Sequence, residues 1–225
     1  CDRLDWSEDV YYSVDWLSYS GLPAGLTEPM LVFTTKLLIG WLPTQAQLHK
    51  YEPNLSPTCP FCQLLPDTSD HPWQCSAAHE WRVLLVHDFS QFLSKLGTCP
   101  AVQSEMCLTL RAALRLTDQR PQWYPYHPDL LLAGVVSREI MAHNGWYHTL
   151  PHAPPGKTGE NWTTAVLRYL WTKLHDRWKL RCRQIHDKAI DSSRLLVSAQ
   201  ARSLLDLLPM IDREYHHLFP SDVHT

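Results

Sequence analysis

Residues 59–97 read CPFCQLLPDTSDHPWQCSAAHEWRVLLVHDFSQFLSKLG, and this stretch decides the fold because it joins candidate metal ligands to an amphipathic helix. The ligand spacing is Cys-x2-Cys-x8-His-x3-Cys, formed by Cys59, Cys62, His71 and Cys75. Two thiolates two residues apart can bind one ion from a tight turn, and a His and a Cys four apart lie on the same side of a helical turn. Three thiolates and an imidazole are typical of structural zinc. The spacing therefore predicts one structural Zn²⁺ per chain, with no position left open for a catalytic water.

Other interpretations of these residues remain open from the sequence alone. Cys59 and Cys62 could form a redox pair or could be buried thiols, although thioredoxin-like redox motifs occur in a βαβ context that is absent here. His79 is a competing ligand that we expect instead on the surface of the following helix. Phe61 and Trp73 are the aromatic residues expected to pack around the ion.

The second half of the stretch predicts the clearest helix of the chain. Its apolar stripe has helical spacing, and Gly97 ends the pattern. The stripe consists of Trp81, Leu84, Leu85, Phe89, Phe92, Leu93 and Leu96. Similar spacing predicts helices over 8–18, 27–41, 45–51, 101–116, 129–147, 161–185 and 195–208, with Pro209 interrupting the last. The first two of these are expected to bury Val10, Val14 and Leu17, and Met30, Phe33, Leu37 and Trp41.

No segment alternates with the period of two that a half-buried strand needs, so the predicted fold class is all-α, with a small zinc knuckle inserted between helices. Two regions are expected. The first, residues 1–98, carries the knuckle over 52–82, and the second, 99–225, carries a basic helix. The proline-rich connector over 117–128 is an equally defensible boundary.

Composition narrows the class of protein. The chain has 225 residues, of which 44% are hydrophobic and 19% charged, and this balance excludes a wholly disordered protein. A net charge of -3 excludes a uniformly basic nucleic-acid binder but allows a local basic face. No apolar run reaches the roughly 18 residues that a membrane-spanning helix needs. Seven cysteines at uneven spacings favour reduced thiols, so we expect an intracellular protein, nuclear or cytoplasmic. Because the sequence starts at Cys1 without a Met, we also expect it to be a fragment of a longer product.

A basic stretch is the second candidate site. Residues 168–202 contain nine Lys or Arg against three Asp, a local net charge of +6. The residues expected to contact a phosphate backbone are Arg177, Lys179, Arg181, Arg183 and Lys188. Candidate stacking residues are Trp123, Tyr124, Tyr126, His127 and Trp171. The alternative is an ordinary solvated helix face over a Trp/Leu core.

A family resemblance follows from these residues taken together. The segment KLLIGWLPT at 36–44 leads into Cys-Pro-x-Cys, followed by Asp67-Thr68, His71, Cys75 and Trp81. This pattern, best over about residues 30–85, resembles the zinc-binding region found downstream of the polymerase in reverse transcriptases of non-LTR (LINE-like) retrotransposons. The resemblance implies the same four zinc ligands and a role in binding template RNA or target DNA. Many members have four residues between the His and the last Cys, and this chain has three.

The resemblance also implies what lies outside this chain. The paired aspartates of the polymerase are absent from the sequence, so we expect a non-catalytic module and not an enzyme. The expected partners are RNA or DNA and the remainder of the parent polymerase, with no membrane and no small-molecule substrate. The alternatives are a zinc-stabilised protein-interaction module and a hydrolase or transferase whose site the sequence does not reveal. The Gly156-Lys157-Thr158 tripeptide is not a P-loop, because Pro151 stands where that motif needs glycine.

Overall fold

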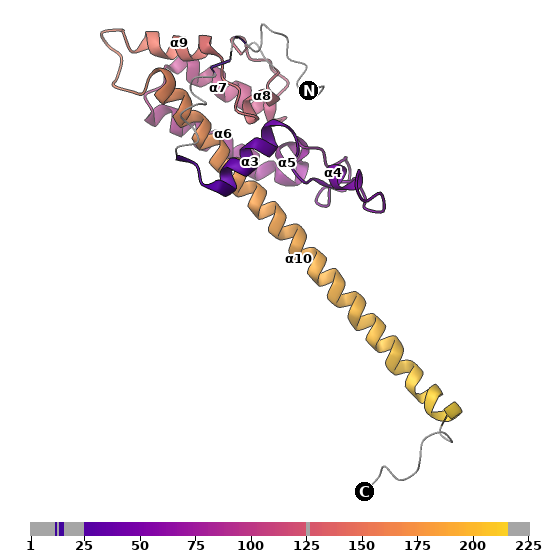
Figure 1. Ribbon diagram of the computed structural model, residues 1–225. Helices are drawn as coiled ribbons and strands as arrows, with labels where there is room; N and C mark the ends of the chain where they lie inside the picture. The colour runs from indigo at the N-terminus through magenta and orange to yellow at the C-terminus, as the bar shows by residue number, and fades with distance from the viewer. Residues whose placement is uncertain (1–11, 13, 16–24, 125–126, 216–225) are drawn as a thin grey trace. The chain divides into compact units, whose positions relative to one another are not determined.

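The structure is all-α over the residues that it describes. The computed structural model (Figure 1) describes residues 12, 14–15, 25–124 and 127–215, with side chains as far as Asp187. Within these ranges it contains helices and no strand, and two isolated bridges join Val14 to Ser137 and Thr58 to Pro66. The predicted all-helical fold class is confirmed.

The described helices follow one another with short connections. They are α3 (Glu28–Leu38), α4 (Gln45–His49), α5 (His71–Gln74), α6 (His79–Lys95), α7 (Pro100–Ala113), α8 (Asp129–Leu132), α9 (Arg138–Tyr147) and α10 (Gly159–Tyr215), with a 3₁₀ turn at Ser76–Ala78 between α5 and α6. Proline occupies the first turn of α3, α5 and α7, where its missing N–H would have no partner in the helix and its fixed φ suits the start of a helix.

Helix α6 matches its prediction closely. Leu85, Phe89 and Leu93 are buried along one face, as the stripe required. Leu84 is a correction, because it is 59% exposed, one residue away from the buried face. Gly97 has a φ of +70° after the helix, and a Cβ there would lie 2.9 Å from the carbonyl oxygen of Pro155, so glycine is required both for the turn and for the close approach.

Two other predicted helices have different ends. Helix α3 buries Met30, Phe33 and Leu37 but ends at Leu38, so Trp41 does not extend the buried face and is 61% exposed. Helix α10 runs through Pro209 to Tyr215, so the predicted interruption at this proline is wrong. The single helix predicted over 161–185 and the separate one over 195–208 both belong to α10.

The helix predicted over 129–147 is broken into α8 and α9. The break contains Gly134, whose φ is +92° and where an added Cβ would lie 2.5 Å from the Trp171 ring. Helix α9 restarts where the Ser137 hydroxyl accepts a hydrogen bond from the Ile140 amide, a side-chain N-cap. A contact from a helix more than thirty residues away in sequence therefore decides this break.

The expected N-terminal helix falls largely outside the described residues. Val10 and Leu17 are among those not described. Val14, expected on a buried helical face, is buried but forms the bridge with Ser137, and the Asp15 amide donates to the carbonyl of Val136 at 3.0 Å.

One hydrophobic cluster runs through most of the chain. Helix α7 packs against α6, α8 and α9, and the cluster takes its largest fully buried side chains from α5, α6 and α10. These are Trp73, Phe89 and Trp162. Among the described side chains, which end at Asp187, the last that packs on this cluster is Trp178, and the chain divides into two units, 1–178 and 179–225.

Helices from both sides of the boundary predicted at 98/99 share this cluster. The 117–128 connector, the other predicted boundary, is bonded into the same core. Tyr124 is buried, its hydroxyl donates to the carbonyl of Val135 at 2.7 Å, and its amide donates to the buried carboxylate of Glu105. In the described part of the chain, none of the helices has the length and apolar character to cross a membrane.

Candidate metal centre

The four predicted ligands lie together. The Sγ atoms of Cys59, Cys62 and Cys75 and a ring nitrogen of His71 all lie within 4.8 Å of one another. The Sγ atoms of Cys59 and Cys75 are 3.8 Å apart, and Sγ of Cys62 is 3.4 Å from Nε2 of His71. Cys62 is half-buried and the other three are buried. The cluster can therefore hold one metal ion, largely shielded from water.

A tight hairpin presents the first two ligands. The Cys59 amide donates to the carbonyl of Leu65 at 2.9 Å, and the amide of Gln63 donates to the carbonyl of Cys59 at 2.9 Å. The bridge between Thr58 and Pro66 closes the hairpin behind them. Gln63 has a φ of 55°, in the left-handed region, so the chain reverses directly after Cys62. This reversal brings the two thiols to one side of the turn.

Helix α5 presents the other two ligands and joins the centre to the core. It is a single turn, and the Cys75 amide donates to the His71 carbonyl at 2.7 Å. Trp73 on the same turn is fully buried in the main hydrophobic cluster, with its ring centroid 6.4 Å from that of Phe33 and 6.3 Å from that of Trp178. Trp73 was expected around the ion, so this placement is a correction. The cause is geometric, because residues of a helical turn are separated by about 100°, so His71 and Cys75 share one side and Trp73 points to the other.

A small separate cluster surrounds the ligands. It consists of Cys59, Cys75 and Ala78, with Phe61, Cys62 and Trp81 packed at its edge. Phe61 is therefore placed beside the ligands as predicted. Trp81 also packs against the main cluster, and its ring centroid lies 6.4 Å from that of Trp73.

The loop before His71 is tied to the preceding helices. The carboxylate of Asp67 accepts a hydrogen bond from the Gln45 amide at 2.8 Å, and its carbonyl accepts one from the Ala46 amide. The hydroxyl of Ser69 donates to the carbonyl of Gly40 at 2.8 Å. These bonds fix the loop at the N-terminus of α4 and the C-terminus of α3, so the ligand positions do not depend on the hairpin alone.

Burial and hydrogen bonding act differently on the thiols. Burial raises the pKa of Cys75 to about 11, and the negative charge of Cys59 adds to the rise. For Cys62, burial raises the pKa, but hydrogen bonds from the backbone at Leu64 and Leu65 outweigh it and lower the pKa below its ordinary value. The hairpin therefore favours a thiolate at Cys62, the least buried of the three sulfurs.

Arg82 is a residue of the site that sequence reasoning missed. It is buried on α6, and its Nη1 donates to the carbonyl of Leu114 at 2.8 Å. Burial lowers the pKa of Arg82, and the negative charge of Cys75 acts against that shift, so the two groups interact. The signal was present, since Arg82 stands three residues before Leu85 and seven before Phe89, in register with the buried face.

His79 is not part of the cluster. It is exposed at the start of α6, and its Nδ1 lies 3.4 Å from Nη2 of Arg82. The prediction that it lies on the helix surface is confirmed. The six described cysteines are free thiols, as a reduced protein requires.

The residues expected to contact phosphate have different environments. Lys179 and Arg183 are exposed, one turn apart on α10. Arg177 is half-buried, with its guanidinium 5.7 Å from the centre of the Trp81 ring. Arg181 is 3% exposed, so it does not face solvent as expected, and the side chain of Lys188 lies outside the described residues.

The expected stacking residues are also divided. Tyr124 and Trp171 are buried, which removes them as exposed platforms, and Tyr126 lies outside the described residues. Trp123 is exposed but its ring stacks on His143, with centroids 5.3 Å apart. His127 is exposed, with its Nδ1 3.5 Å from the Asp129 carboxylate.

No protein-family model, curated protein or solved structure matches this chain.

Proposed function

We propose that this chain is a non-catalytic nucleic-acid-binding module of a retroelement reverse transcriptase, held together by one structural zinc ion. The proposal rests on the Cys₃His cluster. For Zn–S bonds of about 2.3 Å and Zn–N bonds of about 2.0–2.1 Å, tetrahedral angles put two sulfurs about 3.8 Å apart and a sulfur and a nitrogen about 3.6 Å apart. The corresponding distances here are 3.8 Å for Cys59 and Cys75 and 3.4 Å for Cys62 and His71.

The donor set supports a structural ion. Four protein ligands complete a tetrahedral shell, so no coordination position remains for water or substrate. Three thiolates and a neutral imidazole around Zn²⁺ carry a net charge of about -1. The buried guanidinium of Arg82, which interacts electrostatically with Cys75, offsets that charge. Thiolate ligands also need a reducing compartment, which agrees with an intracellular protein in the nucleus or cytoplasm.

Two features support nucleic acid as the partner. Residues 168–202 carry a local net charge of +6, and Lys179 and Arg183 within that stretch are exposed. The resemblance of residues 30–85 to the region downstream of a retroelement polymerase points to template RNA or target DNA. In this proposal the zinc ion fixes the hairpin to the core, and the basic side chains supply the salt-sensitive part of the affinity.

Elemental analysis of the purified chain tests the zinc centre. We expect one zinc per chain, lost together with thermal stability in Cys59→Ser and retained in the control Cys182→Ser, whose side chain is exposed outside the cluster. A folded chain without metal would refute the centre. Iron in place of zinc would refute the assigned metal.

Fluorescence anisotropy with labelled RNA and DNA tests the partner. We expect affinity to fall steeply between low and moderate salt, and Lys179→Glu with Arg183→Glu to weaken binding at least about tenfold. The matched control reverses two exposed charges elsewhere, Lys36→Glu with Lys50→Glu. A flat salt response, or equal effects of the two double variants, would contradict this assignment.

A protein-interaction module is the second candidate, and one observation favours it. Two apolar side chains are largely exposed: Leu64, in the hairpin that carries Cys59 and Cys62, at 79%, and Trp41, next to the Gly40 carbonyl that Ser69 binds, at 61%. The partner would be the polymerase domain of the same polypeptide. Three results together would replace the first function with this second one. The polymerase domain binds this chain, the double variant Leu64→Ser with Trp41→Ser abolishes that binding, and the chain has no affinity for nucleic acid at low salt.

A further inference from the structure

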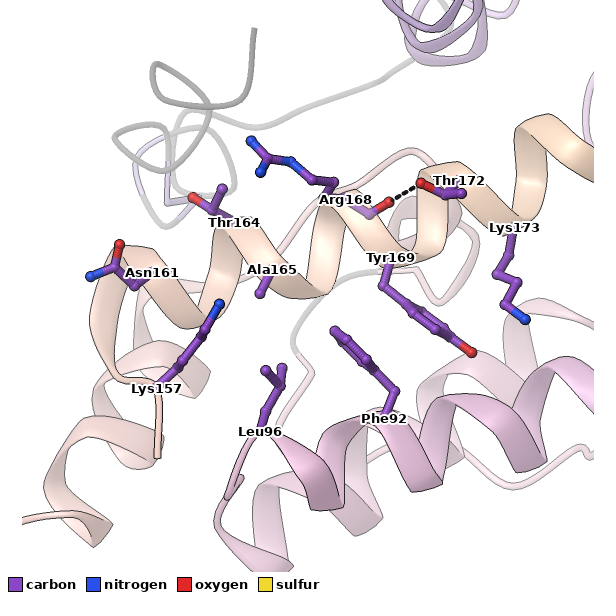
Figure 2. A pocket seen from close by; sticks show the side chains of 10 residues that line it. All are labelled: Phe92, Leu96, Lys157, Asn161, Thr164, Ala165, Arg168, Tyr169, Thr172 and Lys173. Atoms are coloured by element: carbon purple, nitrogen blue, oxygen red, sulfur yellow. Dashed lines mark hydrogen bonds between the residues drawn. The ribbon is translucent and has the colours of Figure 1, made fainter. Parts of the chain in front are cut away.

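A cavity of about 460 Å³ lies between α6 and the first turns of α10 (Figure 2). Its volume falls within the range of about 300–1,000 Å³ that small-molecule sites occupy. Phe92 and Leu96 reach it from α6, and Ala165 and Tyr169 complete the apolar part from α10. The cavity therefore offers an apolar surface to a flat ligand.

Cationic and polar side chains border the same cavity. Lys157 and Arg168 are both exposed, and neither makes an ion pair within the part of the chain that the structure describes. Lys173 is a third cation, but its Nζ is 3.0 Å from the Asp88 carboxylate. Among the described residues, no acidic side chain lines the cavity, so Lys157 and Arg168 make its rim positive. The Arg168 guanidinium lies at the outer side of this rim, where a Cβ added to Gly25 would be 2.5 Å from its Nη2 (Figure 2).

The walls of the cavity are held in place. The Lys157 amide donates to the carbonyl of Leu96 at 3.1 Å, and the side-chain amide of Asn144 donates to the carbonyl of Lys157 at 3.1 Å. The rings of Phe92 and Tyr169 stack with centroids 4.1 Å apart. A ligand would therefore meet a surface that is already formed, which limits the entropic cost of binding.

We infer that this cavity binds one nucleotide unit, with its phosphate between Lys157 and Arg168 and its base against Leu96 and Phe92. Two cations suit a phosphate, and an apolar wall with an aromatic edge suits a base of any sequence. Asn161 and Thr172 border the same space, and they can form hydrogen bonds with a ribose or a base edge. The start of α10 adds the positive end of a helix dipole next to Lys157.

This inference rests on the proposed nucleic-acid function. It adds a second binding surface for the nucleic acid, distinct from Lys179 and Arg183. The nucleotide unit could be free or part of a single strand. Titration of the full chain with UMP and with a fluorescein-labelled twelve-residue oligouridylate separates the two sources. Binding of both assigns a site for a free nucleotide, and binding of the oligonucleotide alone assigns a site for a strand.

Two variants test the cavity itself. Lys157→Glu with Arg168→Glu should weaken oligonucleotide binding at least about tenfold and reduce the salt slope by about two. Ala165→Phe should fill the cavity and weaken binding without any change of charge. Both variants should keep their metal and their melting temperature, and Lys36→Glu with Lys50→Glu is the matched control.

The outcomes separate this inference from the proposed function. If both cavity variants bind as the wild type does while Lys179→Glu with Arg183→Glu does not, the cavity inference fails and the proposed function stands. If the wild-type chain binds no oligonucleotide at low salt, the proposed function fails. If UMP still binds in that case and Ala165→Phe abolishes UMP binding, the cavity is a nucleotide site independent of nucleic acid. If the chain binds neither UMP nor the oligonucleotide, the cavity inference and the proposed function are both overturned.

Discussion

Gln63 occupies the backbone position on which the hairpin of the metal centre depends. Its φ of 55° lies in the left-handed region, which costs a residue with a Cβ about 1–2 kcal/mol. A β-branched side chain fits this region worst. We expect Gln63→Val to lower the free energy of unfolding by about 1 kcal/mol or more and to speed metal loss to a chelator, while Gln63→Gly keeps or improves both.

Thermal melting and the rate of metal transfer to a chromophoric chelator measure these effects. Gln122→Val is the matched control, because Gln122 is exposed and has no left-handed φ. Equal behaviour of the valine and glycine variants at position 63 would show that the turn does not limit metal binding.

Arg82 yields the second prediction at this scale. Arg82→Met keeps much of the side-chain volume but removes the positive charge that interacts with Cys75 and the donor to the Leu114 carbonyl. A buried carbonyl without its donor costs about 1–3 kcal/mol. We expect the variant to lose about that much stability and to bind zinc more weakly, as measured by competition with a chelator. Arg111→Met, at an exposed position on α7, is the control, and unchanged zinc affinity in Arg82→Met would contradict a role for its charge.

Individual residues were predictable from the sequence where their role is local. The four ligands were identified because their spacing is short and chemically specific. Trp73 was expected beside the ion, because the direction of a side chain from a four-residue turn depends on where the core lies. Arg82 on α6 was missed, although it lies in register with the buried face of that helix. Arg181 was expected to face solvent from its charge alone, and its 3% exposure shows that charge does not set burial.

At the scale of elements, α5 is the link between the metal centre and the main core. The small cluster around the ligands contains only Cys59, Cys75 and Ala78 as buried members, too little apolar surface to hold the hairpin without the ion. We therefore expect a strong chelator to expose the amides over 57–75 to hydrogen exchange while α7 and the first turns of α10 stay protected.

Hydrogen exchange with mass spectrometry on the metal-bound and metal-free chain makes this comparison, and Cys182→Ser should behave as the wild type does. Uniform loss of protection would mean that the ion supports the entire fold. No loss over 57–75 would mean that the hairpin is stable without it.

Elements were predictable where the apolar period is uninterrupted, as in α6 and α7. They were not where distant contacts intervene. Gly134 breaks the helix over 129–147 because Trp171 occupies the space of its missing Cβ. A composition rich in proline and aromatic residues indicated a connector over 117–128. That composition could not show that the buried Glu105 accepts hydrogen bonds from the Trp123 and Tyr124 amides.

At the scale of the molecule, the chain divides into the units 1–178 and 179–225. The division expected at 98/99 stays a prediction, and the core is shared by helices on both sides of that point. Since Trp178 is the last of the described side chains that pack on the main hydrophobic cluster, we expect a chain truncated after this residue to fold, to bind one zinc and to keep a melting temperature within a few degrees of the full chain. Failure of the truncated chain to fold would show that the second unit supports the first.

The same truncation tests where nucleic acid binds. It removes Lys179 and Arg183 with the rest of the basic stretch that follows, and it keeps the cavity of Lys157 and Arg168. Each lost phosphate contact should reduce the salt slope by about one, so we expect a lower slope and weaker affinity with residual binding that Ala165→Phe removes. Salt titrations of both chains with the same oligonucleotide measure this. An unchanged slope would exclude the second unit from the interface, and residual binding that Ala165→Phe does not affect would place the remaining contacts elsewhere on residues 1–178.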